Sequence, residues 1–135
     1  MDSPAVEPAQ RLKQLRDGLI RLHKTLLDSE RYVYEHDIER VTSNGRMLEL
    51  VVSDPYFAWL HRISELIVEI DERLDNDEEP AGPAEAGQYI GQTRALLVPS
   101  EDGSEFERRY HNALQRDPDV VIAHGRMMAV LGSLG

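Results

Sequence analysis

The feature that most constrains the fold is a row of leucines near the N-terminus, in which each leucine follows the last by three or four residues. The row consists of Leu12, Leu15, Leu19, Leu22 and Leu26. Because an α-helix makes one turn about every 3.6 residues, this spacing places the row on one helix face. The same face is widened or continued by Ile20, Leu27, Val33, Tyr34 and Ile38. We therefore predict a long helix over residues 10–41 that needs other helices to cover its apolar face.

The same period recurs later in the chain. It predicts long helices over residues 54–75, 84–98 and 117–132, and shorter helices near 46–52 and 104–115. The residues expected to face inward in the three long helices are Leu60, Ile63, Ile67, Ile70 and Leu74; Ala86, Ile90, Thr93 and Leu97; and Val121, His124, Met128 and Leu131. These helices supply the cover that the leucine row requires.

Two Asp-Pro pairs mark expected helix starts, at Asp54-Pro55 and Asp117-Pro118. An aspartate at the N-cap accepts a hydrogen bond from a backbone N–H of the first turn. Proline is tolerated at the next position because the N–H that it lacks would have no partner there. We therefore predict that Asp54 and Asp117 cap the helices that follow them.

Together these helices predict an all-α, four-helix-bundle-like single domain with two additional short helices. A chain of 135 residues suits one domain and buries enough surface to fold without disulfides or structural metals. We expect residues 1–9 to be a flexible N-terminus and residues 10–135 to form the bundle. Residues 75–83, which are rich in acids and proline, are the expected acidic connection within it.

The composition excludes several classes of function. The chain has no cysteine, which excludes disulfide frameworks, cysteine-bound metals and thiol nucleophiles. Its net charge of −10 opposes attraction to nucleic acid and anionic lipid, and no apolar run is long enough to cross a membrane. The first ten residues lack the basic and apolar regions of a signal peptide. We expect a cytoplasmic protein with neither nucleic acid nor membrane as its partner.

Two segments of the chain resemble a small, uncharacterised family of bacterial all-helical proteins. The segments are DPYFAWLHRISELIVEIDERLD and RYHNALQRDPDVVIAHGRM, and the resemblance spans residues 10 to 130. It implies a helical fold and a bacterial origin. Since the family has no established activity, the resemblance implies no catalytic or binding residues.

Polar residues on or beside the predicted core form one candidate site for a ligand. They are Glu30, Tyr34, Ser64, Asp71 and His124. If these side chains converge, they form a polar pocket that binds a small molecule or transfers a proton. The alternative is that each has an ordinary structural role. In that case Glu30 and Asp71 lie at the edges of the bundle. Their partners are then Arg31, Arg73 or lysines, and His124 is a hydrogen-bonded core residue.

Motifs for metal binding and catalysis are missing from the sequence. Helical bundles build dimetal centres from inward-facing Glu residues and Glu-x-x-His pairs, but no Glu here is followed three residues later by His. The sequence also lacks a G-x-S-x-G elbow, a P-loop and a dinucleotide-binding fingerprint. We therefore predict no catalytic residue, no metal centre and no cofactor.

Charged residues are divided unevenly along the chain. Residues 65–79 contain eight acids and one base, whereas residues 11–24 contain five bases and one acid. One hypothesis is antiparallel association into a homodimer, in which the basic helix of one copy meets the acidic helix of another. The alternative is that neighbouring helices compensate each other's charge within one copy.

Three aromatic residues at the start of the 54–75 helix are candidates for a protein interface: Tyr56, Phe57 and Trp59. They cannot all face one helical row, so some of them are expected near the surface. Large, rigid aromatic side chains anchor interfaces well, and Trp59 is the first candidate. The alternative is local packing against the predicted short helix that precedes them.

These observations predict a non-enzymatic helical interaction or regulatory module, whose partner is a second copy of the chain or another protein. The alternative hypothesis is a small-ligand or metal-binding helical bundle with an internal polar site. The two hypotheses differ in where the function lies, because the first needs an exposed surface and the second needs a polar interior.

Overall fold

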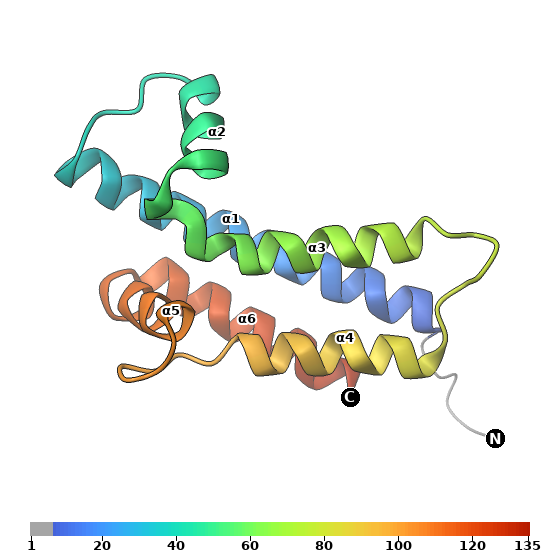
Figure 1. Ribbon diagram of the computed structural model, residues 1–135. Helices are drawn as coiled ribbons and strands as arrows, with labels where there is room; N and C mark the ends of the chain where they lie inside the picture. Colours follow the sequence, from blue (N-terminus) through green and yellow to red (C-terminus); the bar gives the residue numbers. More distant parts are fainter. Residues whose placement is uncertain (1–6) are drawn as a thin grey trace.

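The computed structural model describes residues 7–135, and over this range the chain is all-α, as predicted (Figure 1). Its helices are α1 (Pro8–Asp37), α2 (Asn44–Ser53), α3 (His61–Leu74), α4 (Pro83–Leu96), α5 (Glu105–Arg116) and α6 (Pro118–Leu134). A short 3-10 helix, η1 (Pro55–Leu60), leads directly into α3. The helices α1, α3, α4 and α6 correspond to the four predicted long helices, and α2 and α5 to the two short ones.

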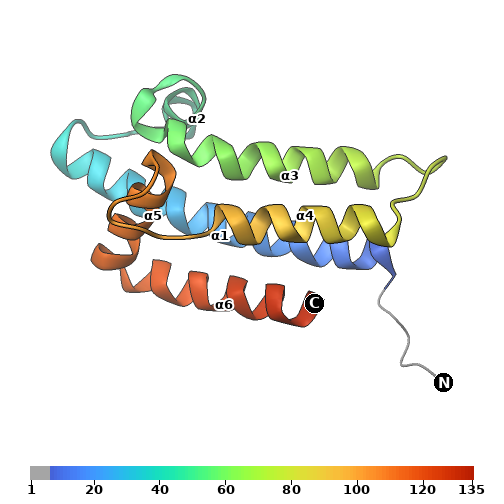
Figure 2. The same cartoon turned by 60° about the horizontal axis from the view of Figure 1, so that its bottom comes forward.

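Helix α1 lies at the centre of the arrangement and packs against α3, α4 and α6. The turned view in Figure 2 shows α3, α4 and α6 side by side with α1 behind them. Helices α2 and α5 both lie at the end of the molecule where α1 finishes and α3 and α6 begin. This arrangement is compatible with a four-helix-bundle-like architecture.

The leucine row of α1 is buried as predicted, with each leucine no more than 1% exposed. The prediction is wrong for Ile20 and Ile38, which are 45% and 58% exposed. Ile20 directly follows Leu19 and so points about 100° away from it around the helix. Helix α1 ends at Asp37 rather than at residue 41, so Ile38 lies outside it.

The predicted helix over residues 54–75 divides into η1 and α3. Buried residues occur at every third position from Phe57 through Leu60 and Ile63 to Leu66. This is the period of a 3-10 helix, carried into the first turns of α3. Leu66 is therefore buried where Ile67 was expected, and Ile67 itself is half-buried.

Both Asp-Pro caps are confirmed. The Asp54 carboxylate accepts a hydrogen bond from the backbone N–H of Tyr56 at 2.8 Å. The Asp117 carboxylate accepts one from the N–H of Asp119 at 2.9 Å. Each cap satisfies a backbone donor that has no partner within its own helix.

The inward residues of α4 are predicted correctly, but of the four predicted for α6 only Leu131 is buried. Ala86, Ile90, Thr93 and Leu97 are all buried. In α6 the buried residues are Val120, Met127, Leu131 and Leu134. Val121 is exposed, and His124 and Met128 are half-buried. Since α6 carries apolar residues around most of its circumference, spacing alone does not select its inner face.

Part of the predicted flexible N-terminus, residues 1–6, lies outside the described residues. The described chain enters α1 at Pro8, two residues before the predicted start of that helix. None of the helices described over residues 7–135 combines the length and the apolarity that a membrane crossing requires.

Gly18 allows α1 and α6 to approach closely, because a Cβ atom at this position would lie 2.8 Å from the sulfur of Met127. We expect Gly18→Val to lower the free energy of unfolding by about 1–3 kcal/mol through overpacking, as measured by urea denaturation. Gly91→Val is the matched control, since no atom lies within 4 Å of a Cβ there. Equal destabilisation by the two variants would contradict this account.

Candidate functional site

Glu30 is the most deeply buried charged residue among the predicted ligand-binding positions. Its side chain on α1 is only 3% exposed and forms an ion pair with Arg116, the last residue of α5. The same guanidinium donates a hydrogen bond to the Ser29 hydroxyl at 3.2 Å. Because a buried carboxylate needs a partner, this pair ties the end of α5 to α1.

Aromatic side chains cover this ion pair from one side. The pKa of Tyr56 is raised to about 12. Burial is the main cause, and the adjacent charge of Glu30 is the second. Tyr34 is buried with its ring centroid 5.4 Å from that of Tyr56, and its hydroxyl donates to Glu39 at 3.4 Å. The Arg109 guanidinium lies 5.8 Å from the centroid of the Tyr56 ring, a cation–π contact. Glu30 and Tyr34 therefore belong to one packed cluster at this end of the molecule.

Asp71 and Ser64 lie elsewhere, on α3. Asp71 is half-exposed and accepts a hydrogen bond from Arg16 of α1 at 2.9 Å. The Ser64 hydroxyl donates to the carbonyl of His61 in its own helix at 3.2 Å. The cation partners therefore differ from those predicted, since Glu30 pairs with Arg116 and Asp71 with Arg16.

His124 forms a third, separate contact between α5 and α6. The hydroxyl of Tyr110, which is fully buried, forms a hydrogen bond with the Nδ1 atom of His124 at 2.5 Å. Burial lowers the pKa of His124 and raises that of Tyr110. This contact matches the alternative in which His124 is a hydrogen-bonded residue of the core.

The five predicted ligand-binding residues do not form one polar pocket. No hydrogen bond or ion pair joins any two of them in the part of the chain that the structure describes. Over residues 7–135, no group of three or more His, Asp or Glu side chains is placed to hold a metal ion.

The predicted interface aromatics are core residues rather than surface anchors. Phe57 and Trp59 are buried, and Tyr56 is half-buried in the cluster around Glu30. The Trp59 ring packs edge-on against Phe106 of α5, with their centroids 5.3 Å apart. The indole Nε1 of Trp59 is buried without a hydrogen-bond partner. Within one copy of the chain η1 packs against α2, as in the alternative, and also against α1 and α5, so Phe57 and Trp59 are not exposed.

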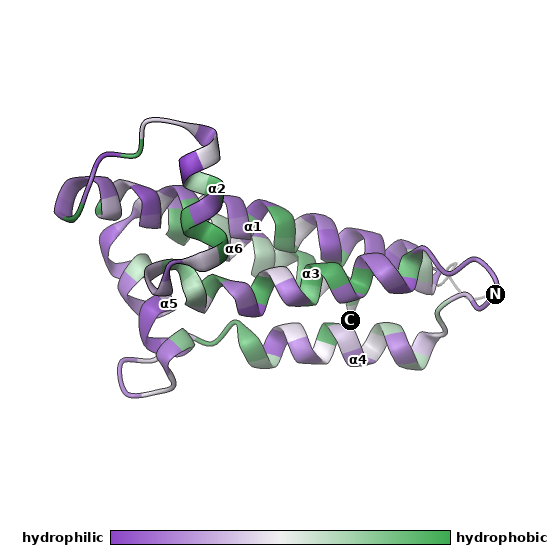
Figure 3. Cartoon of the chain, turned by 45° about the horizontal axis from the view of Figure 1, so that its top comes forward, coloured by the Kyte–Doolittle hydropathy of each residue, from purple (hydrophilic) through white to green (hydrophobic). Residues whose placement is uncertain are grey.

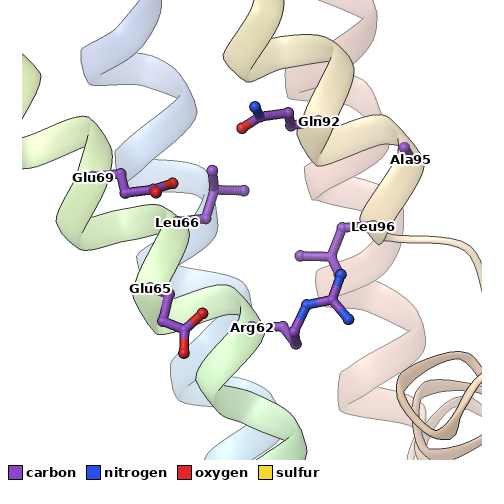
Figure 4. A pocket seen from close by; sticks show the side chains of 7 residues that line it. All are labelled: Arg62, Glu65, Leu66, Glu69, Gln92, Ala95 and Leu96. Atoms are coloured by element: carbon purple, nitrogen blue, oxygen red, sulfur yellow. The ribbon is translucent and has the colours of Figure 1, made fainter.

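An open groove lies between α3 and α4, where the sequence predicted no site. The two helices each pack against α1 but make little contact with each other. The resulting space is about 380 Å³ in volume. It is lined by Arg62, Glu65, Leu66 and Glu69 of α3 and by Gln92, Ala95 and Leu96 of α4. Figure 4 shows Leu66 and Leu96 extending toward each other across the groove.

The charge of the groove comes mainly from α3. Glu65 and Glu69 are exposed, and neither they nor Arg62 form an ion pair within residues 7–135. Gln92 and Ala95 on the opposite side carry no charge. The groove is thus apolar where Leu66 and Leu96 meet, and acidic along the α3 edge.

One end of the groove is fixed by a polar clasp. The guanidinium of Arg73 on α3 donates to both carboxylate oxygens of Glu85 on α4, at 2.5 and 2.8 Å. It also donates to the carbonyl of Glu79 in the loop between the helices. The pair holds the pKa of Glu85 below its ordinary value, because the ionised form accepts these hydrogen bonds. The clasp sets the spacing of α3 and α4 beside the loop.

Comparison with known proteins adds no functional evidence. No protein-family model, curated protein or solved structure matches this chain.

The Glu30 ion pair yields a stability prediction. Arg116→Met leaves the Glu30 carboxylate buried without a cation, and we expect it to lower the free energy of unfolding by about 3 kcal/mol at neutral pH, measured in urea. The double variant Glu30→Leu/Arg116→Met should recover most of that loss, because no unpaired charge remains. Lys24→Met is the control, since its pair with Asp28 is exposed. A double variant as unstable as Arg116→Met would contradict the ion-pair account.

The half-buried histidines make stability depend on pH. Burial lowers the pKa of His124, and burial followed by the charge of His61 lowers that of His23. Both histidines therefore bind a proton more readily in the unfolded chain than in the folded one. The free energy of unfolding is then largest above about pH 6.5 and falls as the pH drops below it. His124→Asn should reduce this fall, because an amide oxygen can accept the Tyr110 hydroxyl without titrating. Urea denaturation at several pH values measures the effect.

The exposed His36 provides the matched control for this experiment. His36→Asn should leave the pH dependence of unfolding as it is in the original chain. If His124→Asn and His36→Asn behave alike, the burial of His124 is not a source of the pH dependence.

Proposed function

We propose that this chain is a non-enzymatic interaction module whose α3–α4 groove binds a basic amphipathic helix of a partner protein. The observation that carries the proposal is the open groove, with leucines across its floor and, along one edge, glutamates that have no ion pair within residues 7–135. The resemblance of the sequence to bacterial helical proteins supports a further proposal, that the chain binds its partner in the cytoplasm of a bacterium.

The shape of the groove suits a helix. Helices α3 and α4 have 14 residues each, which corresponds to a length of about 21 Å, or nearly four turns. Grooves of this kind accept the apolar face of an amphipathic helix, whose side chains at every third and fourth position serve as anchors. Leu66 and Leu96 provide the apolar contact for such anchors.

The charge of the groove specifies the polar face of that helix. Lys or Arg residues beside the apolar anchors would lie against Glu65 and Glu69, which have no intramolecular ion pair among the described residues. The net charge of −10 attracts a basic partner from a distance and raises its rate of encounter. Apolar contact then supplies most of the affinity, because exposed ion pairs contribute little.

The interior supports the interaction hypothesis more than the ligand hypothesis. Glu30 already pairs with Arg116, and His124 is already hydrogen-bonded to the Tyr110 hydroxyl. These groups are occupied by partners within the fold, whereas the charged groups of the groove are not. The groove is therefore the place where binding a partner adds interactions without breaking others.

A pair of model peptides tests this proposal. One is an amphipathic Leu/Lys helix of about 18 residues, or five turns, and the other has Glu in place of Lys. We expect the basic peptide to bind, as measured by fluorescence anisotropy, and the acidic peptide not to bind. Affinity should fall as salt rises from about 20 to 300 mM, because salt screens the attraction.

Two variants locate the binding within the groove. Glu65→Lys/Glu69→Lys should lower the affinity for the basic peptide by about tenfold or more, since two attractive charges become repulsive. Asp37→Lys/Glu101→Lys changes the net charge equally at exposed positions outside the groove and should have a much smaller effect. Ala95→Trp should block the groove without altering the buried core. Equal weakening by both charge reversals, or full binding by Ala95→Trp, would contradict the proposal.

A further inference from the structure

The outer sides of α4 and α6 differ from the rest of the molecule in their lack of acids. None of the 25 acidic residues of the chain falls within residues 86–100 or 120–135. These segments form most of α4 and α6, which lie side by side in Figure 2. Figure 3 shows strongly hydrophilic residues along α1, whereas α4 carries paler ones. We call the outward sides of α4 and α6 the acid-free face.

The α6 part of this face is apolar and exposed. Val121 and Ile122 are 51% and 52% exposed. Gly125, Ala129 and Gly132 continue the same side of the helix and are also exposed. With Val120, Met127 and Leu131 buried on the opposite side, α6 is apolar around nearly its whole circumference. A helix of this kind is typically covered on all sides.

The glycines of this face leave open space beside the helices within one copy of the chain. A Cβ atom at Gly125 or Gly132 on α6, or at Gly87 or Gly91 on α4, would have no atom within 4 Å. Glycine weakens the interior of a helix, so its presence at four open positions calls for another reason. Glycine permits the close approach of another backbone, which is what a second helix packed on this face would need.

The two helices are held together at the C-terminal end of α6. The Arg94 guanidinium on α4 donates to the carbonyl of Leu131 at 2.7 Å and to that of Gly135 at 3.2 Å. Arg94 and Arg126 are the two arginines of the acid-free face, and both are exposed. The Arg94 bonds make the face continuous across α4 and α6, and its charge comes from these two cations.

We infer that the acid-free face binds a second copy of this chain, forming a homodimer in which α6 packs against α6. Two copies that each carry a net charge of −10 repel each other wherever acids line the approach. On the acid-free face apolar contact is available, and acids approach it at the start of α6, where Asp28, Asp117 and Asp119 line a pocket together with Ile122. A self-complementary patch of this kind generates a closed, two-fold dimer.

The size of the face fits such a dimer. Helix α6 has 17 residues, or about 25 Å, and two adjacent helices present a width of about 20 Å. The face then offers roughly 500 Å² per copy, or about 1,000 Å² in total, which is the lower end of the range for specific interfaces. We therefore expect a dimer with a dissociation constant in the micromolar range.

The charged helices are less suited to joining two copies. Arg16 of the basic segment already pairs with Asp71, and Lys24 with Asp28, within one copy. Arg11 donates to the carbonyl of Leu134. This matches the alternative of compensation within one copy and leaves the acid-free face as the favoured surface for self-association.

Sedimentation equilibrium over a dilution series tests the inference. The mass should rise from 15.4 kDa toward twice that value as the concentration increases. Added salt should strengthen the dimer, because it screens the repulsion between copies. Salt has the opposite effect on the binding of a basic helix to the groove, so the failure of one proposal can be told from failure of the other.

A matched pair of variants locates the dimer contact. Val121→Glu places an acid on the acid-free face and should weaken the dimer by about tenfold or more. Val68→Glu makes the same change on α3, at a valine that is 52% exposed, and should leave the dimer unchanged. Ala129→Glu is a second probe of the face should Val121→Glu fail to fold, which circular dichroism reports.

Three outcomes would overturn the inference. The first is a protein that stays at 15.4 kDa up to millimolar concentration. The second is a dimer that both Val121→Glu and Ala129→Glu leave intact. The third is a dimer that Val68→Glu weakens as much as Val121→Glu does, which would assign the effect to net charge rather than to this face.

Discussion

The burial of one face of α1 is the constraint on which the rest of the structure depends. Each leucine of its central row is excluded from water, and full burial of such a side chain stabilises the fold by about 1.5–3 kcal/mol. No single helix can cover a stripe that runs along most of α1, so α3, α4 and α6 share it. Since α3 and α4 each bury their apolar residues against α1, they do not need to pack closely against each other. The groove between them is a consequence of this central position.

Ion pairs between helices fix relative positions that the apolar core alone does not fix. Arg116 joins α5 to Glu30 of α1, and Arg73 joins α3 to Glu85 of α4. Such pairs add less stability than the core does, because desolvation of the charges offsets much of their attraction. They are specific, however, since each fixes one position of one helix relative to another. The buried polar residues Ser29 and Glu30 thus have their partner, Arg116, within the fold.

The sequence was sufficient to predict the structure where a helix has one apolar face or a local cap. The leucine row, the inner residues of α4 and both aspartate caps depend on neighbours within a few positions of the chain, and all are found as predicted. The inner face of α6 could not be predicted, because apolar residues surround that helix and only its packing on α1 selects a side. The partner of Glu30 could not be predicted either, since Arg116 lies 86 positions away. The groove depends on how two helices are spaced around a third, which no local pattern encodes.

The two proposed surfaces meet on α4, and they are compatible when the dimer contact is made through α6. Gln92, Ala95 and Leu96 of α4 line the groove, whereas no residue of α6 lines it. A dimer formed through α6 therefore leaves both acidic grooves open, one in each copy. A partner with two basic helices joined by a linker of sufficient reach could fill both grooves at once, so that the second binding event becomes intramolecular. In that arrangement, a weak dimer and a modest affinity for each helix are enough for tight and reversible binding, because binding of the first helix raises the effective concentration of the second.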